Sequence, residues 1–305
     1  MTQLLLVMRD GRKLEVTEYG DRTGHPAFFF HGLIGSHHQA SYISDEAGRA
    51  GLRIIAPNRP GVGRSEFIAR ATALDAVSDV EDVAGALRLD EFSLIGISGG
   101  TPYALAALSR LTHRVKTVTV ISGMGPMRLR GALRGMDRRR KVALEVGSRW
   151  PFLARRGFQK AERRFQADPE KLLDRLVKTW SPADQALFEQ KVVYDLFMQD
   201  LHQVFTIGAG PVTLAHELAL YRNYGVSVKD LPPNKMITLW HGLADNIVPP
   251  AMACAMALAL PNCEVHLVAG GHFVAVDIAG LIIARIRKLL DDPVPVETTT
   301  RSEVE

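Results

Sequence analysis

The chain has 305 residues, of which 47% are hydrophobic and 23% charged, and its formal net charge is +4. These proportions are those of an ordinary soluble globular protein, and the length accommodates one large α/β domain with an insertion. The two cysteines, Cys254 and Cys263, exclude a disulfide framework and do not have the spacing of a metal site. We therefore expect them to be small buried side chains in a reducing compartment.

Neither a signal peptide nor a membrane span is expected. The apolar run at residues 4–8 ends at Arg9 and Asp10 and has no basic segment before it. No stretch approaches the roughly 18 uncharged apolar residues that a membrane-spanning helix needs. The sequence thus predicts a cytoplasmic protein without stable membrane insertion.

Strand and helix signals alternate along the first part of the chain. The runs at 4–8 and 13–19 flank Asp10-Gly11, which predicts a hairpin. Apolar runs and helical spacing predict the following further elements: strands at 27–30, 52–56, 92–97, 115–121, 235–240 and 263–268, and helices at 43–50, 72–87 and 101–111. Regular alternation is typical of a parallel sheet with helices on both faces, so we expect a mostly parallel sheet of about eight strands.

One serine stands where a predicted strand passes directly into a helix. Residues 96–100, Gly-Ile-Ser-Gly-Gly, fit the pattern G-x-S-x-G with Ser98 at its centre. At such a corner the hydroxyl is exposed to substrate, and Gly96 and Gly100 let the neighbouring backbone pass without a Cβ clash. The amide of Gly99 then points toward the oxygen of a bound carbonyl. The alternative, an incidental serine in a glycine-rich loop, is not excluded by this pattern alone.

Three predicted strands end at the residue types that activate a hydroxyl. Ser98, Asp245 and His272 follow the strands at 92–97, 235–240 and 263–268 in that chain order. A histidine accepts the serine proton, and a carboxylate orients the ring and offsets the imidazolium charge. Asp245 could instead be only a turn residue, but its position after His241-Gly242 favours the role of the acid.

These motifs resemble those of the α/β-hydrolase superfamily over roughly residues 12–291. The matching pieces are His31-Gly32, the run Arg-Pro-Gly-Val-Gly-Arg-Ser at 59–65, the elbow at 96–100, His241-Gly242 with Asp245 and Val248-Pro249, and Gly271-His272. The resemblance implies Ser98 as nucleophile, Asp245 as acid and His272 as base. It also implies an oxyanion hole made by the amides of Leu33 and Gly99. We expect no metal and no cofactor.

The resemblance has one departure and one exclusion. Asn58 stands where an aspartate commonly precedes Arg-Pro-Gly, which puts a local charge contact in doubt. Relatives that open epoxides or remove halide carry aspartate at the elbow, so a serine there argues against both activities. We expect His31 and His241 to support loop geometry through their backbone rather than their rings. For His37 and His38, lining of the pocket is an alternative to a place in the core or on the surface.

Between Gly123 and about Leu231 the strand signals stop and helical periodicity takes over. The resemblance implies a helical cap over the active site, which divides the chain into a core at 1–123, a cap at 124–231 and a second part of the core at 232–291. Residues 292–305 contain Pro, Thr and Glu without an apolar period, so we expect a disordered tail there. The apolar side chains of the cap would pack it and roof an apolar pocket. They include Met127, Met136, Trp150, Phe152, Phe158, Trp180, Phe188, Tyr194, Phe197, Met198 and Phe205.

The predicted cap also concentrates positive charge. Its first part holds Arg128, Arg130, Arg134, Arg138, Arg139, Arg140, Lys141, Arg149, Arg155, Arg156, Lys160, Arg163 and Arg164. We interpret this charge as the solvated outer face of amphipathic helices. Attraction of an anionic substrate or a membrane surface is the alternative. Nucleic acid is not expected, because no binding module accompanies the charge.

The sequence predicts a carboxylic ester hydrolase that acts on a small or medium, largely apolar acyl compound as its small-molecule substrate. Three alternatives use the same triad: hydrolysis of a carbon–carbon bond, hydrolysis of an amide, and acyl transfer to an acceptor other than water. A receptor-like protein that binds a ligand in the same pocket is a further alternative, from another class of function.

Overall fold

A computed structural model describes residues 1–292 of the chain. Eight strands form one sheet in the order β1-β2-β4-β3-β5-β6-β7-β8. The strands are β1 (Thr2–Val7), β2 (Lys13–Gly20), β3 (His25–Phe30), β4 (Leu52–Pro57), β5 (Phe92–Ile97), β6 (Val115–Ile121), β7 (Ile237–Gly242) and β8 (Cys263–Val268). β2 pairs antiparallel with β1 and β4, and every later pair is parallel. The predicted hairpin and the mostly parallel sheet are confirmed.

The helices fall into two groups. The first group flanks the sheet and contains α1 (Ser41–Arg49), α2 (Val77–Ala86), α3 (Thr101–Leu111), α10 (Ala251–Ala259) and α11 (Ala279–Asp291). The second group follows β6 and contains α4 (Arg138–Arg149), α5 (Pro151–Ala167), α6 (Pro169–Val177), α7 (Pro182–Phe188), α8 (Lys191–His202) and α9 (Gly210–Leu220). The helix predicted over 72–87 is divided into a 3₁₀ turn at Ala73–Ala76 and α2.

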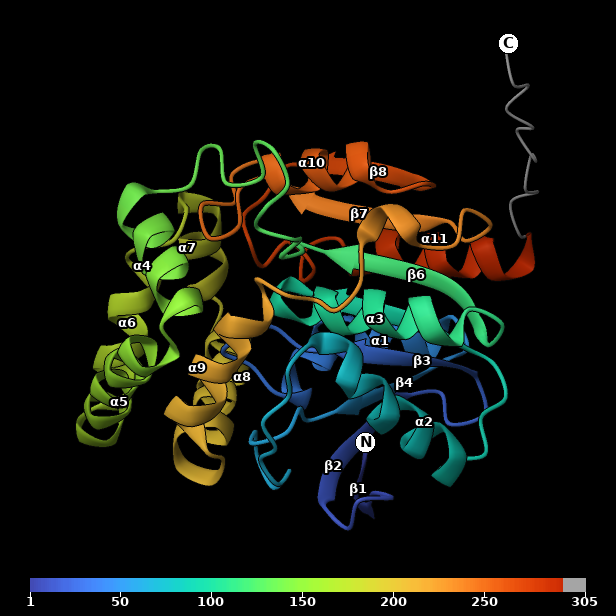
Figure 1. Ribbon diagram of the computed structural model, residues 1–305, viewed down its shortest axis with the longest axis horizontal. Helices are drawn as coiled ribbons and strands as arrows, with labels where there is room; N and C mark the ends of the chain where they lie inside the picture. The colour runs from blue at the N-terminus through green and yellow to red at the C-terminus, as the bar shows by residue number, and fades with distance from the viewer. Residues whose placement is uncertain (293–305) are drawn as a thin grey trace.

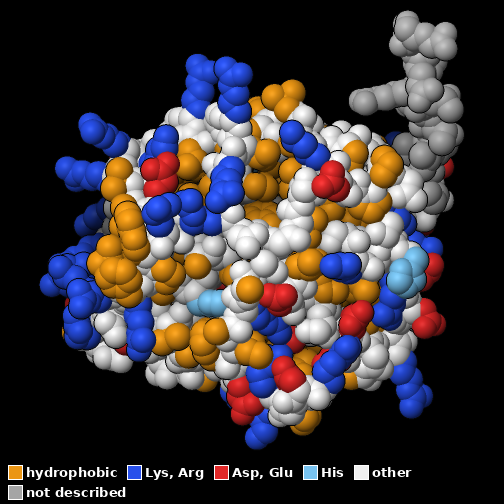
Figure 2. Space-filling view, viewed as in Figure 1, with side chains coloured by type: hydrophobic (Ala, Val, Ile, Leu, Met, Phe, Trp, Pro, Cys, Tyr) orange, Lys and Arg blue, Asp and Glu red, His pale blue; other side chains and the backbone are white. Residues whose placement is uncertain are grey.

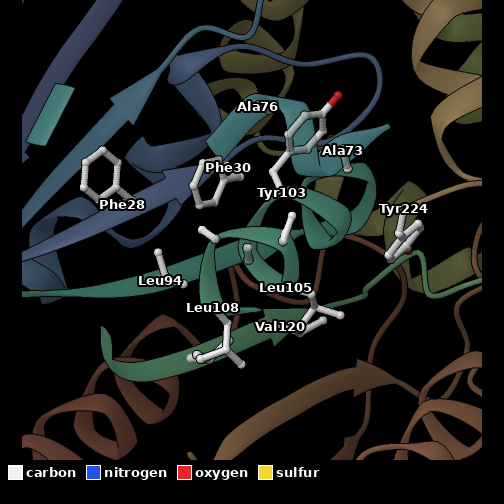
Figure 3. Close-up of a cluster of buried hydrophobic side chains, with 14 of the residues drawn as sticks. Phe28, Phe30, Ala73, Ala76, Leu94, Tyr103, Leu105, Leu108, Val120 and Tyr224 are labelled. Atoms are coloured by element: carbon white, nitrogen blue, oxygen red, sulfur yellow. The ribbon is translucent and has the colours of Figure 1, made fainter. Parts of the chain in front are cut away.

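The sheet separates two apolar cores because successive strand residues point to opposite faces. In β3, Phe28 and Phe30 join the core beneath α2, α3 and α10, while Phe29 joins the core beneath α1 and α11. Figure 3 shows Phe28 and Phe30 beside Leu94 and Tyr103 in the first of these cores. Burial on both faces explains why the central strands read as continuous apolar runs in the sequence.

The second group of helices lies at one end of the sheet. In Figure 1 the arrowheads of β6 and β7 point toward α4–α9, so these helices lie beyond the carboxyl ends of the parallel strands. Between β6 and β7 the described chain contains no strand, as the sequence predicted. We call residues 124–231 the helical insertion. Its status as a separate cap domain stays a prediction.

Two details differ from the predictions. β7 runs through Gly242 instead of ending at Trp240, so the His241-Gly242 motif belongs to the strand itself. Cys254 was predicted to be buried, but it is exposed, and Cys263 is half-buried. The reason is the orientation of α10, which turns Met252 and Met256 toward the sheet and leaves Cys254 on its outer side.

Within residues 1–292, no helix is both long enough and apolar enough to cross a membrane. The predicted disordered tail, 292–305, lies outside the described residues except for Asp292.

Candidate active site

Ser98 occupies a crowded corner between β5 and α3. Its φ of +49° lies in the left-handed region, which non-glycine residues adopt only when the surrounding structure requires it. A Cβ on Gly100 would overlap the carbonyl of Phe30, and a Cβ on Gly96 would lie 3.1 Å from that of Ala104. The flanking glycines therefore let the strand and the helix meet at a sharp angle, with the serine at its tip.

His272 and Asp245 lie beside this serine. The Nε2 atom of His272 is 2.9 Å from the Ser98 Oγ, and its Nδ1 atom is 2.7 Å from the Asp245 Oδ2. The three side chains come from the ends of β5, β7 and β8, which are parallel strands of one sheet. His272 and Asp245 are both buried. The structure thus brings together the three residues that the sequence singled out, with the ring between hydroxyl and carboxylate.

Asp245 is also a turn residue. It therefore combines the two positions that the sequence left open, that of a residue fixing the turn and that of a carboxylate beside the histidine. Its Oδ1 atom accepts hydrogen bonds from the amides of Ile247 and Val248 at 2.8 and 2.9 Å. Its Oδ2 atom faces His272 and lies 3.2 Å from the Nε2 of His241. One oxygen fixes the loop, and the other faces the candidate base.

Burial and charge act against each other at this pair. Burial would raise the pKa of Asp245, but the neighbouring His272 and hydrogen bonds from His241 and His272 hold the pKa well below its usual value. Burial would lower the pKa of His272, but the Asp245 carboxylate, with help from Asp184, raises the pKa above the ordinary histidine value. The carboxylate is therefore ionised and stabilises an imidazolium beside Ser98.

The loop after β3 brings Leu33 close to the same site. The carbonyl of Gly32 accepts a hydrogen bond from Arg59 Nη2 at 2.8 Å, and the amide of Gly32 donates to Gln39 Oε1 at 2.7 Å. In a planar trans peptide the N–H points opposite to the C=O, so the Leu33 amide faces away from Arg59. A Cβ on Gly99 would lie 3.0 Å from the Leu33 nitrogen, which shows how close the two residues are.

A tyrosine of the helical insertion also packs closely against Gly99. A Cβ on Gly99 would overlap the hydroxyl of Tyr221, which follows α9 and is buried. Gly99 is also the second residue of the 3₁₀ turn at Ser98–Gly100, where the first amides have no acceptor within the turn. Leu33 and Gly99 thus both lie beside Ser98, and their role as an oxyanion hole stays a prediction.

The hydroxyl of Ser98 opens into an apolar cavity of about 160 Å³. The sheet end contributes the loop residues Leu33, Ile34, Ile247 and Phe273, and the helical insertion contributes Leu176, Trp180 and Phe197. A second hollow of about 540 Å³ lies among α4, α5, α6 and α9 and shares Ile34 and Leu176 with the first. Of the aromatic residues predicted as pocket lining, Trp180 and Phe197 line the first cavity, and Phe158 and Phe205 line the second.

Comparison with known proteins agrees with this geometry. A family model described as the alpha/beta hydrolase fold matches residues 28–277. The chain belongs to the α/β hydrolase fold family. No curated protein matches it.

Solved structures of α/β hydrolases resemble the whole chain at low identity. An esterase from Exiguobacterium antarcticum superposes with a TM-score of 0.69 at 16% identity, covering 95% of this chain and 100% of the esterase. An enol-lactonase from Burkholderia xenovorans LB400 gives 0.69 at 15% identity, with 95% and 100% covered. A thermophilic esterase from Thermogutta terrifontis gives 0.68 at 19% identity, with 95% and 98% covered. These likenesses show the fold.

The departure at Asn58 from the usual α/β-hydrolase pattern is absorbed by hydrogen bonds. The Asn58 side chain donates to Glu15 Oε2 at 2.8 Å and accepts from the amide of His37 at 2.7 Å. Glu15 keeps a charged partner, since Arg64 donates to it at 2.8 Å. In place of the charge contact that an aspartate at position 58 would make, the neutral Asn58 amide bridges Glu15 and the His37 amide. His37 uses its ring to bond Tyr19, and neither His37 nor His38 lines the Ser98 cavity.

The expectation that His31 and His241 act through backbone rather than ring is wrong. Nδ1 of His31 donates to the Gly32 carbonyl at 3.0 Å, and its Nε2 accepts from the Arg59 amide at 3.2 Å. Nε2 of His241 donates to the carbonyl of Val248 at 2.9 Å. Buried ring nitrogens need partners, and the nearest groups are those of the loops that the two rings support.

Asp184 is a residue of this hydrolase site that sequence reasoning missed. Its two carboxylate oxygens accept the amides of His272 and Phe273, each at 2.9 Å, and the Ser181 hydroxyl donates to it at 2.7 Å. Asp184 belongs to α7 of the helical insertion and is buried. In the sequence, Ser181 and Asp184 show only the spacing of a helix cap. Nothing in that spacing indicates a contact with a loop some ninety residues away.

Proposed function

We propose that this protein is a serine hydrolase that cleaves carboxylic esters through an acyl-enzyme on Ser98. The observation that carries the proposal is the chain of contacts from Ser98 through His272 to Asp245, at 2.9 and 2.7 Å. Such a chain lets the imidazole remove the hydroxyl proton as the oxygen attacks a carbonyl carbon.

The proposed reaction has two halves. Ser98 Oγ attacks the ester carbonyl while His272 takes the proton, and the amides of Leu33 and Gly99 bind the oxygen that becomes negative. The tetrahedral intermediate collapses, the alcohol leaves with the proton from His272, and the acyl group stays on Ser98. Water then attacks the acyl-enzyme in the same way, which releases the acid and restores the serine.

The cavity walls support a small or medium, largely apolar acyl group. The space of about 160 Å³ at Ser98 is lined mainly by hydrophobic side chains, with Gln39 and Tyr42 among its few polar groups. The larger adjoining hollow offers room for an apolar extension of the substrate. We also propose that the helical insertion is a cap, because three of its side chains, Leu176, Trp180 and Phe197, form walls of the Ser98 cavity.

The test is Ser98→Ala, assayed with nitrophenyl esters of graded acyl length and with a fluorophosphonate probe. We expect turnover to fall by about 10⁴-fold or more and labelling to disappear. The matched control is Ser122→Ala, because Ser122 is a buried serine at the end of the neighbouring strand whose hydroxyl has no partner in the described chain. Undiminished labelling of Ser98→Ala with retained circular dichroism would contradict the proposal.

The same panel separates the alternatives. An anilide, a 1,3-diketone and an added alcohol acceptor report amide hydrolysis, carbon–carbon cleavage and acyl transfer, respectively. A receptor-like protein would bind such compounds without steady turnover. Ester turnover that exceeds the other reactions is the expected outcome.

A further inference from the structure

The corner between α4 and α5 exposes large apolar side chains to solvent. Trp150, Phe152 and Leu153 lie close together in the chain there and are 45%, 58% and 39% exposed. The inner side of α5 packs against α9, so the fold already uses the apolar stripe of that helix. The exposed residues of the corner are therefore additional to those that the fold needs.

The two helices that meet at this corner are strongly basic. Their cations are Arg138, Arg139, Arg140, Lys141, Arg149, Arg155, Arg156, Lys160, Arg163 and Arg164, and their only acids are Glu145 and Glu162. The formal charge of the whole chain is only +4, so the remainder is net negative. Within residues 1–292, none of these cations forms an ion pair with a carboxylate. Figure 2 shows hydrophobic side chains bordered by Lys and Arg at the side of the molecule where α4–α6 lie.

The larger hollow is walled by the same two helices. Leu144 of α4 and Leu153 and Phe158 of α5 line it, so Leu153 belongs both to the exposed corner and to the hollow. The hollow in turn shares Ile34 and Leu176 with the Ser98 cavity. The exposed corner and the Ser98 cavity thus border the same apolar hollow.

We propose that the α4–α5 corner, residues 138–164, docks on the surface of an anionic lipid bilayer. Aromatic and leucine side chains enter the headgroup region, while surrounding Lys and Arg attract anionic lipids. The exposed Trp150 and Phe152 between two basic helices favour a bilayer over nucleic acid, because contacts with a phosphate backbone need positive charge alone. The protein lies on the bilayer and does not span it. Delivery of apolar esters into the hollow rests on the proposed function, whereas docking itself does not.

The test is co-sedimentation of the full chain with vesicles of phosphatidylcholine alone or with phosphatidylglycerol added. We expect binding only to the anionic vesicles and loss of binding at high salt. Arg155→Glu/Arg156→Glu should weaken the partition coefficient by about 30-fold or more, since each basic residue near the surface contributes about fivefold and two of them are lost. Trp150→Ser/Phe152→Ser should weaken it on the order of tenfold at unchanged charge.

Matched controls change the charge, or remove an exposed apolar side chain, outside the α4–α5 corner. Arg22→Glu/Arg110→Glu makes the same change in charge at exposed positions of the sheet domain, and Leu258→Ser removes a leucine that is 91% exposed on α10. Both should bind as the wild type does, and so should Ser98→Ala, which separates docking from catalysis.

Four results would overturn the proposal: no binding to anionic vesicles, equal binding to neutral ones, equal weakening by the control variants, or preferential binding to a DNA duplex at the same salt. A dimer in solution that dissociates in Trp150→Ser/Phe152→Ser would overturn it as well, and would assign the corner to a second copy of the chain.

Discussion

Two regions contribute to the site in different ways. One is the set of loops at the carboxyl ends of the parallel strands, and the other is the helical insertion. Ser98, Asp245 and His272 stand at the carboxyl ends of parallel strands. Hydrogen bonds from the Ile247 and Val248 amides fix the Asp245 loop within a few residues of its strand. The insertion supplies cavity walls, an adjoining hollow and a basic, partly apolar outer surface. The candidate catalytic residues and most of the walls of the two cavities thus come from different regions of this molecule.

Three buried acids of the insertion connect the two regions. Asp184 of α7 accepts the amides of the His272 loop, Asp200 of α8 accepts the amide and hydroxyl of Ser36, and Glu217 of α9 lies 3.3 Å from Arg59. Each acid bonds a loop at the carboxyl end of the sheet. The insertion is therefore held over the site by specific polar contacts as well as by apolar packing.

The largest expected effect comes from changing Asp245, at the carboxyl ends of the parallel strands. In Asp245→Asn the carbonyl oxygen can still accept the Ile247 and Val248 amides, but an NH₂ group then faces His272 Nδ1. The ring must accept at Nδ1 and carry its proton on Nε2, so it cannot take the Ser98 proton. We expect kcat for nitrophenyl esters to fall by about 10⁴-fold with the fold retained. A loss below about tenfold would show that Asp245 does not orient the base.

A pair of glycine variants contrasts the two regions directly. A Cβ in Gly99→Ala would overlap Tyr221 and crowd the Leu33 amide, so we expect kcat to fall by about 10²- to 10³-fold. A Cβ on Gly157, within α5, would meet nothing within 4 Å. Gly157→Ala should therefore leave kcat unchanged and stabilise the fold by about 0.5–1 kcal/mol. Steady-state kinetics and thermal unfolding measure both, and similar kinetics for the two variants would contradict the assignment of Gly99.

The contact between insertion and base predicts opposite shifts in pH dependence. The Asp184 carboxylate raises the pKa of His272, and Arg140 lowers it. Because the base must be neutral, the acidic limb of kcat/KM should move to lower pH in Asp184→Asn and to higher pH in Arg140→Gln. Asp184→Asn should also reduce kcat by about 10- to 100-fold, since one acceptor for the loop amides is lost. If the acidic limb of kcat/KM does not move in these variants, Asp184 has only a structural role.

The smallest effect concerns stability at Asp200. Burial raises the pKa of this carboxyl to about 8, far above that of an unfolded aspartate. The folded state therefore keeps a proton that the unfolded state releases. As the pH rises toward about 8, the free energy of unfolding should fall by about 1 kcal/mol per pH unit. Above that pH the fall should level off.

Asp200→Asn should remove most of this slope in urea denaturation between about pH 6 and 8. Asp195→Asn, which changes an exposed aspartate on the same helix, is the control and should keep the slope. An unchanged slope in Asp200→Asn would show that the group titrates elsewhere.

Much of the sheet could be predicted from the sequence because its signals are local. Helical spacing of Ala and Leu predicted α3, and strand signals predicted β6 and β8, with the bounds that the structure has. The ring contacts of His31 and His241 were not predicted, since the partner of a buried nitrogen depends on which loop packs beside it. The exposure of Cys254 depends in the same way on the rotation of α10 about its axis.

By itself, the sequence determined the alternation of strand and helix, the corner at Ser98 and the order in which Ser98, Asp245 and His272 follow their strands. These properties come from residue type and short spacing, which act within one element and its turn. Only the tertiary structure decided that Asp184 binds the His272 loop, that the Ser98 cavity and the larger hollow share Ile34 and Leu176, and that the aromatic side chains of the α4–α5 corner stay exposed. Contacts between segments far apart in the chain depend on how whole helices pack, and no local pattern encodes that packing.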